Sequence, residues 1–182
     1  VASRLSYMLW GTMPHEALRK AAAAGELSTE GRVRAWALDM IDDPRARAQV
    51  LDFHRQWLGL DALRGLNKDA WDFPEWNEDL KRSLREEADR FIEEAVFEGP
   101  GDLATLLTAS SGPVDERLAA LYGADAPEAP GEWGTASHHP GERAGLLTQG
   151  WFLATGAHLS HPSPVLRGVF VLDRLLCRRP SP

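Results

Sequence analysis

Apolar residues recur with the period of a helix over nearly the whole chain. In residues 76–98 they return every three or four positions for about five turns, while charged side chains fill the opposite face. The dipeptides Asp43-Pro44 and Ser163-Pro164 suit the N-cap and first position of further helices, and glycines end several runs. No segment carries a clear strand pattern. The sequence therefore predicts an all-α fold, an irregular bundle of about eight to ten short and medium helices.

The pattern changes towards the end of the chain. Residues 124–142 carry prolines and glycines without periodicity, and a loop of this length is typical of a functional or mobile segment. Residues 143–182 then hold two apolar helical runs; the second is too apolar for one narrow stripe, so we expect it to pack on most sides. We expect a helical module over 1–123, and a C-terminal helical hairpin with the start of a linker over 143–182. The hairpin is expected to close the bundle by packing on 1–123 as one compact unit.

Charge divides the chain near the same place. The formal net charge is −7, but residues 143–182 hold five arginines against Asp173 alone, so that segment is +4 and the remainder −11. The basic end attracts the acidic part of the same molecule or docks elsewhere, and both interpretations stay open. Nucleic acid is not an expected partner, because binding it needs a concentrated cationic face. No apolar run approaches the ~20 residues of a membrane span, so no span is expected.

Several classes of site are excluded because the chain does not carry their residues. Cys177 is the single cysteine, which excludes an internal disulfide and a multi-cysteine zinc site; whether it pairs with another segment stays open. The sequence has no Gly-x-Ser-x-Gly elbow, His-Glu-x-x-His motif, phosphate loop or dinucleotide fingerprint. The chain opens on Val1 without a signal-peptide pattern, and we expect it to be an internal piece of a longer protein. We expect no cofactor within it.

Two carboxylates are the candidates for catalysis, and a cluster of aromatic residues is a candidate for stacking on a substrate. Glu86 and Glu87 belong to the charged side of the long predicted helix, where paired carboxylates do acid–base work if one is desolvated. The alternative is a solvated face on which glutamates pair with arginines at helical spacing. Trp71, Phe73 and Trp76 are expected to plug one end of the bundle, or to stack on sugar rings if they are exposed.

Polar residues near the elbow of the hairpin are candidates for binding. Neutral imidazoles bind transition metals or serve as axial haem ligands, but a site requires two or three of His138, His139, His158 and His161 to converge. Otherwise they are solvated, and we assign no metal ligand. Buried polar side chains need partners, so those at the elbow either tie it to carbonyls and carboxylates or line a small ligand pocket. The binding candidates are Gln149, His158, His161, Ser163 and Arg167.

Several segments, taken together and in this order, resemble a known group of families. SRLSYMLWGTMPHEAL at 3–18, FHRQWLGLD at 53–61 and VDERLAALYG at 114–123 resemble one module of these proteins. RAGLLTQGWFL at 143–153 and SPVLRGVFVLDRLLC at 163–177, before a proline-bearing tail, look like the next module. The proteins concerned are planctomycete-type cytochrome-associated families of unknown function.

The resemblance implies a large, exported, multidomain bacterial protein and hence an extracytoplasmic location. It also implies a proline-rich linker after this point that leads to a Cys-x-x-Cys-His segment carrying c-type haem. That motif is absent here, and arginines and a serine interrupt the tail. The expected partners are neighbouring domains of the same polypeptide, a c-type haem domain among them. No catalytic residue is carried over from these families.

Three functions follow as hypotheses. The first is a non-catalytic helical module of an exported multidomain protein that packs against or positions a c-type cytochrome domain. The second is part of an exported, carbohydrate-directed enzyme that uses the helix carboxylates and exposed aromatic side chains. The third is a His-based metal site.

Overall fold

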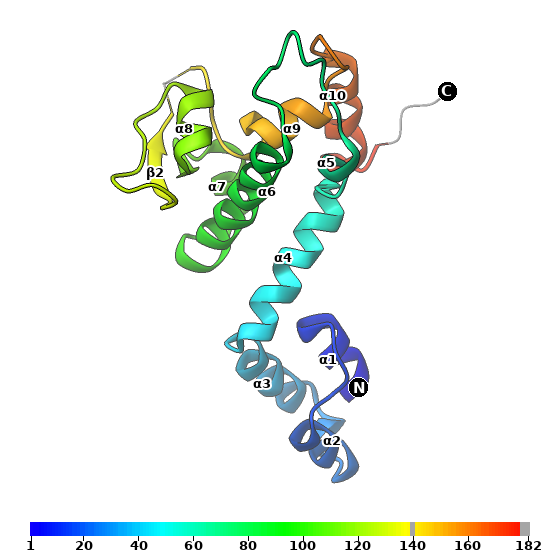
Figure 1. The fold of residues 1–182 in the computed structure, drawn as a ribbon. Coiled ribbons are helices and arrows are strands. Elements are labelled where there is room, and N and C mark those ends of the chain that lie inside the picture. Colours follow the sequence, from blue (N-terminus) through cyan, green and yellow to red (C-terminus); the bar gives the residue numbers. More distant parts are fainter. Residues whose placement is uncertain (139–140, 179–182) are drawn as a thin grey trace. The chain divides into compact units, whose positions relative to one another are not determined.

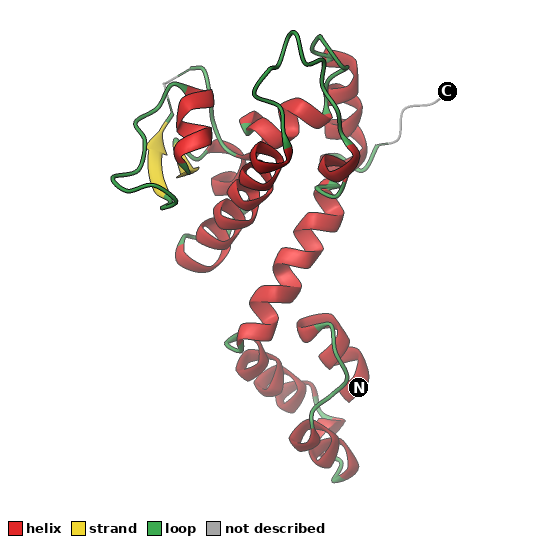
Figure 2. Cartoon of the chain, viewed as in Figure 1, coloured by secondary structure: helices red, strands yellow, loops and turns green. Residues whose placement is uncertain are grey.

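The chain is mostly α-helical, as its periodicity predicts. The computed structural model describes residues 1–138 and 141–178, and within them it contains ten α-helices and one two-stranded sheet (Figure 1). Helices account for most of the ordered backbone, and the strands form a small antiparallel pair (Figure 2). The chain divides into two compact units, Val1–His54 and Arg55–Pro182, with the boundary inside helix α4.

The first unit is built from short helices around its own core. Its elements are α1 (Ala2–Trp10), α2 (Glu16–Ala23), the 3-10 turn η1 (Glu26–Ser28), α3 (Glu30–Ile41) and the first part of α4 (Pro44–Leu58). Trp10 is buried, and its indole N–H donates to the carbonyl oxygen of Met40 at 2.8 Å. The guanidinium of Arg45 lies 3.5 Å from the centre of the Trp10 ring and also pairs with Asp43 at 2.7 Å. Because Asp43 accepts the Arg45 backbone N–H as well, the Asp43-Pro44 helix start is confirmed.

The second unit holds the longest run of regular structure. Its elements after α4 are α5 (Ala62–Gly65), α6 (Glu78–Glu93), the π-turn η2 (Glu94–Glu98), α7 (Leu103–Thr108), β1 (Ser111–Val114), α8 (Glu116–Tyr122), β2 (Gly134–Ser137), η3 (Leu146–Thr148), α9 (Gly150–Thr155), α10 (Pro164–Phe170) and the π-turn η4 (Val171–Leu175). Helix α6 is its centre: α5, α8, α9 and β1 all contact it (Figure 1). The apolar stripe predicted for this helix is buried, and Asn77 caps its start by accepting the Leu80 N–H at 2.9 Å.

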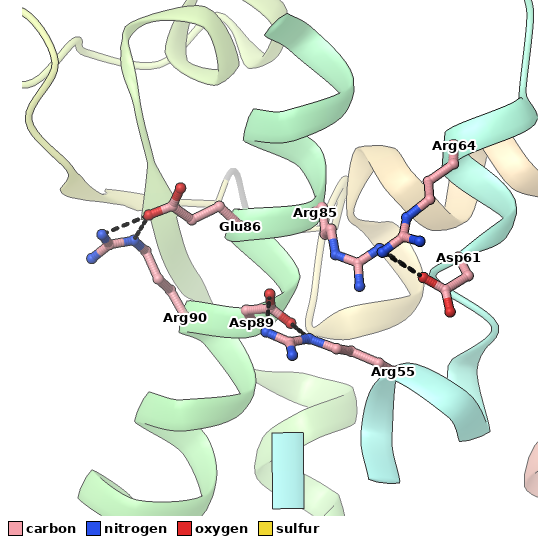
Figure 3. A network of polar contacts seen from close by, with 7 residues as sticks. All are labelled: Arg55, Asp61, Arg64, Arg85, Glu86, Asp89 and Arg90. Atoms are coloured by element: carbon pink, nitrogen blue, oxygen red, sulfur yellow. Dashed lines mark hydrogen bonds and ion pairs between the residues drawn. The ribbon is translucent and has the colours of Figure 1, made fainter. Parts of the chain in front are cut away.

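Ion pairs join the polar side of α6 to the end of α4 and to α5 (Figure 3). Arg55 donates from Nε and Nη2 to the two oxygens of Asp89, both at 2.7 Å. Arg85 reaches Asp61 at 2.9 Å. A two-pronged pair between partly buried groups is the geometry in which an ion pair contributes most, so this network fixes the neighbours of α6 on its polar side.

The C-terminal hairpin attaches to the same unit. Ser163 caps α10 by accepting the Leu166 N–H at 3.3 Å, with Pro164 at the first helical position, as the sequence predicts. Phe170 packs on Phe152 of α9 with ring centroids 5.0 Å apart. The Trp57 indole donates to the carbonyl oxygen of Arg174 at 2.8 Å. Aromatic burial and hydrogen bonds to backbone carbonyls therefore hold the hairpin.

Each of the two compact units has apolar residues packed within it. Residues 1–54 enclose a core of Leu5, Trp10, Leu18, Leu27, Met40 and Ala46, whereas residues 55–123 share their core with the hairpin. Within the second unit, the hairpin contacts α6 and α7.

The two strands were not expected from the sequence. Residues Ser111–Val114 pair antiparallel with Gly134–Ser137, with Ser111 opposite Ser137 and Val114 opposite Gly134. The first strand contains Gly112 and Pro113, two residue types that are uncommon inside strands. Both strands have four residues, too few for an alternating pattern to appear, and α8 with its following loop brings them together.

The last helix is less buried than predicted. No residue of α10 or of η4 is buried in the described part of the chain, although its apolar residues are numerous. Phe170 faces α9, while Val165 is 74% exposed. Helix α9 has six residues and covers only one side of α10.

Gly145 provides a test of how closely the hairpin approaches the rest of the unit. It has φ +57°, ψ −166°, and a Cβ there would overlap the backbone carbonyl of Leu107. We expect Gly145→Ala to lower the free energy of unfolding by about 3 kcal/mol or more, from strain and steric overlap together. Urea unfolding followed by circular dichroism measures this. Gly123→Ala is the matched control: φ is +66° but the space is open, so the cost should stay near ~1 kcal/mol, and equal costs would contradict the packing.

Candidate functional site

A cavity of about 660 Å³ opens in the second unit beside α6, α9 and the elbow of the hairpin. Its size lies within the range of small-molecule sites, roughly 300–1,000 Å³. The apolar part of its wall comes from Phe73, Trp76, Leu80, Leu84, Leu121 and Leu153. The polar part includes Lys68, Tyr122, Arg143, His158, His161 and Arg167. An apolar wall with a few polar groups is typical of a site for an organic ligand.

Tyr122 connects the cavity wall to the interior. Its hydroxyl lies 2.9 and 2.8 Å from the two carboxyl oxygens of Glu87. The same hydroxyl oxygen accepts the backbone N–H of Gly150 at 2.8 Å. The guanidinium of Arg143 lies 3.5 Å from the centre of the Tyr122 ring. Helix α6, helix α8 and the start of α9 therefore meet at one hydroxyl group.

Glu87 is 2% exposed, and this burial controls its protonation. Burial raises the pKa of Glu87 to about 8, against the opposing effects of the Tyr122 hydrogen bond and of the Arg143 charge. Burial, and then the nearby Glu87, also raise the pKa of Tyr122. Both groups therefore hold their protons at neutral pH. The Tyr122 hydroxyl is engaged with Glu87 and Gly150, so the pair is a structural junction and not a free acid–base pair.

The two carboxylates singled out in the sequence have different environments. Glu86 is exposed and accepts from Nε and Nη2 of Arg90 at 2.9 and 2.7 Å, the solvated arrangement expected for this face (Figure 3). Glu87 does not belong to that face. It follows Leu84 by three positions and precedes Phe91 by four, which places it on the apolar stripe of α6. That spacing was the available signal for its burial.

The five binding candidates at the elbow separate into two groups. Gln149 and Ser163 are buried and structural: the Gln149 side-chain oxygen accepts the Trp151 indole N–H at 2.8 Å, and Ser163 caps α10. His158, His161 and Arg167 line the cavity. The imidazole centroids of His158 and His161 are 4.7 Å apart. Hydrogen bonds from Gln149 or Arg167 to distant carbonyls or carboxylates, which the sequence suggested, are not the interactions that position the elbow.

Lys68 holds the elbow, and sequence reasoning missed it. Its ammonium donates to the carbonyl oxygens of Ala154 at 2.8 Å, Ala157 at 3.4 Å and His158 at 2.7 Å. Ala154 belongs to the last turn of α9, whose final carbonyls have no partner within the helix, and Ala157 and His158 follow the end of the helix. Burial lowers the pKa of Lys68. Residues 60–75 show no period that would have pointed to it.

The aromatic cluster does not form a plug. Trp71 is 92% exposed, whereas Phe73 and Trp76 line the cavity. The Trp76 indole donates to the carbonyl oxygen of Leu66 at 3.2 Å, which fixes the ring at the wall. Trp71 therefore differs in its environment from Phe73 and Trp76.

The histidines do not gather into a ligand set in the described residues. No group of three or more His, Cys, Asp or Glu side chains in ranges 1–138 and 141–178 is arranged to hold a metal ion. His138 follows β2 and lies near Gly112, and burial lowers its pKa. His139 lies outside the described residues.

Glu87 predicts a pH dependence of stability. Below about pH 4.5 the carboxyl is protonated in both states; above it the unfolded chain loses the proton while the folded chain keeps it up to about pH 8. Stability should therefore fall as pH rises through this window, by at most roughly 4–5 kcal/mol, since one pKa unit corresponds to about 1.4 kcal/mol. Urea midpoints measured across the window test this. Glu87→Gln should remove most of the decline and Glu86→Gln should keep it; the same decline in all three proteins would contradict the assignment.

Comparisons with known proteins agree with the resemblance noted in the sequence. The family model described as "PSD4: Protein of unknown function (DUF1592)" matches residues 1–124, and that described as "PSCyt3: Protein of unknown function (DUF1588)" matches residues 143–182. Neither a curated protein nor a solved structure matches the chain. None of the helices in the described part of the chain combines the length and apolar character that crossing a membrane requires. The first match covers more than half of the chain, which therefore belongs to the DUF1592 family and continues into a DUF1588 segment.

Proposed function

We propose that this chain is a non-catalytic helical module of an exported, multidomain protein, and that it docks a c-type cytochrome domain of the same polypeptide. The observation that carries the proposal is an exposed apolar stripe on the hairpin, made of Val165, Val169, Leu172 and Leu176. The name of the family that matches this segment contains the element "Cyt", which supports the choice of partner.

The stripe has the geometry of a docking face. Its residues follow one another at intervals of four, three and four positions, which places them on one side of α10 and η4. Phe170 turns the opposite way, towards α9. A continuous apolar face on a surface helix is unfavourable in water and marks a surface that a partner covers.

Charge suits the same partner. The segment that bears the stripe has a net charge of +4, and Arg174 and Arg178 within it are exposed. A haem domain with an acidic rim around an apolar centre would complement it, with charges increasing the rate of encounter and the apolar centre giving affinity.

The site chemistry also supports a non-catalytic role. Glu87 is sealed behind Tyr122 and protonated at neutral pH, so it offers no carboxylate to a substrate. One observation favours the second hypothesis, a carbohydrate-directed enzyme: Phe73 and Trp76 line a cavity with the exposed carboxylates Glu75 and Glu142. That hypothesis predicts hydrolysis of a glycan by the purified chain, which the docking role does not.

The docking face is tested by titrating the isolated c-type haem domain of the same polypeptide against the full chain at low salt. Val169→Glu should weaken binding at least about tenfold, because it places a charge in the centre of the apolar contact. Isothermal titration calorimetry measures the affinity. Leu103→Glu is the matched control, since Leu103 is also exposed but lies on α7, away from the stripe. Absence of binding at low salt, or equal effects of both variants, would overturn the proposal.

A further inference from the structure

We propose that the cavity of the second unit binds a small organic carboxylate with an apolar or aromatic body, and that Arg167 anchors the carboxylate. This site is separate from the docking face: Arg167 lines the cavity, whereas the docking residues of α10 do not. The proposal does not depend on the partner of that face.

The shape and lining of the cavity determine the body of the ligand. Its volume of about 660 Å³ suits a molecule with an aromatic ring or a medium-length chain. Phe73, Trp76, Leu84 and Leu153 supply apolar wall. Transfer of an apolar body from water to such a wall is favourable, because it removes apolar surface from water.

Arg167 determines the head group. Its Nε is buried and has no hydrogen-bond acceptor among the described residues. A buried charged donor without an acceptor is costly, and native proteins pair such groups. The planar guanidinium donates two parallel hydrogen bonds to a carboxylate, the acceptor that best fits Nε and the neighbouring nitrogen.

Gly156 sets the course of the Arg167 side chain. A Cβ at position 156 would lie 2.5 Å from the Cγ of Arg167 and 3.5 Å from its Cδ. The stem of Arg167 therefore occupies the space that only glycine leaves open. This packing limits the positions of the guanidinium and reduces the entropy lost on binding.

The other permanent cations of the wall already have partners. Lys68 directs its ammonium at three backbone carbonyls, and it has three hydrogens to donate. Arg143 donates to the carbonyl oxygen of Thr148 at 2.9 Å and covers the Tyr122 ring. Arg167 differs from these two cations because its buried Nε–H has no acceptor among the described residues.

The acidic residues of the wall do not reverse this preference. Glu75 and Glu142 are exposed, so water and salt screen their charges. The Nε of Arg167 is buried and is screened less. His158 and His161 are exposed on the same wall. A ligand carboxylate is therefore favoured over a ligand amine.

The preference is tested on the full chain with three probes of the same body: 3-phenylpropanoate, 3-phenylpropanamide and 3-phenylpropylamine. Ligand-observed NMR titration gives the three affinities. The carboxylate should bind at least about tenfold more tightly than the amide, as a charged hydrogen bond requires, and more tightly than the amine. No binding of the carboxylate at about 10 mM, equal binding of the amide, or preference for the amine would overturn the proposal.

Variants locate the anchor. Arg167→Gln should weaken carboxylate binding about tenfold or more and leave amide binding unchanged, whereas Arg178→Gln, which changes an exposed arginine outside the cavity, should alter neither. Gly156→Ala keeps the guanidinium but displaces it, and should weaken carboxylate binding as well. Circular dichroism checks that each variant folds.

A direct signal keeps the test decisive if Arg167→Gln fails to fold. The Nε–H resonance of Arg167, assigned by its loss in Arg167→Lys, should shift downfield on addition of 3-phenylpropanoate and not on addition of the amide. An unmoved resonance with the probe bound would place the ligand elsewhere and overturn the anchor.

Discussion

The second unit depends on one hydroxyl group. Tyr122 contacts the buried carboxyl of Glu87 on α6 and accepts the N–H of Gly150 at the start of α9. This contact requires the backbone to come close, and a Cβ on Gly150 would lie 2.5 Å from a methyl group of Leu84 and 2.8 Å from the Tyr122 hydroxyl. A buried carboxyl group costs free energy unless it has a hydrogen-bond partner. Here that partner is Tyr122, which also accepts a hydrogen bond from the first residue of α9. The cavity wall is built on that junction.

Local features of the sequence predicted much of the fold. The side chains of Asp43 and Ser163 each accept a backbone N–H from two or three residues further along the chain, so these caps act regardless of distant packing. Gly11 and Gly123 end their helices with positive φ, as helix stops do. The long stripe of α6 was readable because its period extends over several turns. These signals are complete within a short stretch of chain.

Features that depend on distant partners were not predictable in the same way. Glu87 has the spacing of a core residue, but its ionisable side chain predicts an exposed position. Its burial depends on Tyr122 and α9, which are distant in the sequence. Arg167 was recognised as a polar residue among apolar ones, yet its unpaired Nε depends on how its stem passes Gly156. The strand residues Gly112 and Pro113 have low strand propensity, and only pairing with Thr135 and Ala136 places them in a sheet. Tertiary contacts override local preference at each of these positions.

The same junction gives a physical reason for the two family segments to occur together. The DUF1592 match ends at residue 124, two positions after Tyr122, and the DUF1588 match begins at 143, before Gly150. Without the second segment, Leu84 and the Tyr122 hydroxyl would lose the contact with the start of α9. Without the first segment, the buried Trp151 would lose its cover and the N–H of Gly150 would lose its acceptor. Each segment has an apolar surface that the other covers and a polar group that the other pairs. Separating the two segments would therefore cost several kcal/mol. The family boundary therefore crosses one folding unit, and the cavity belongs to neither segment alone.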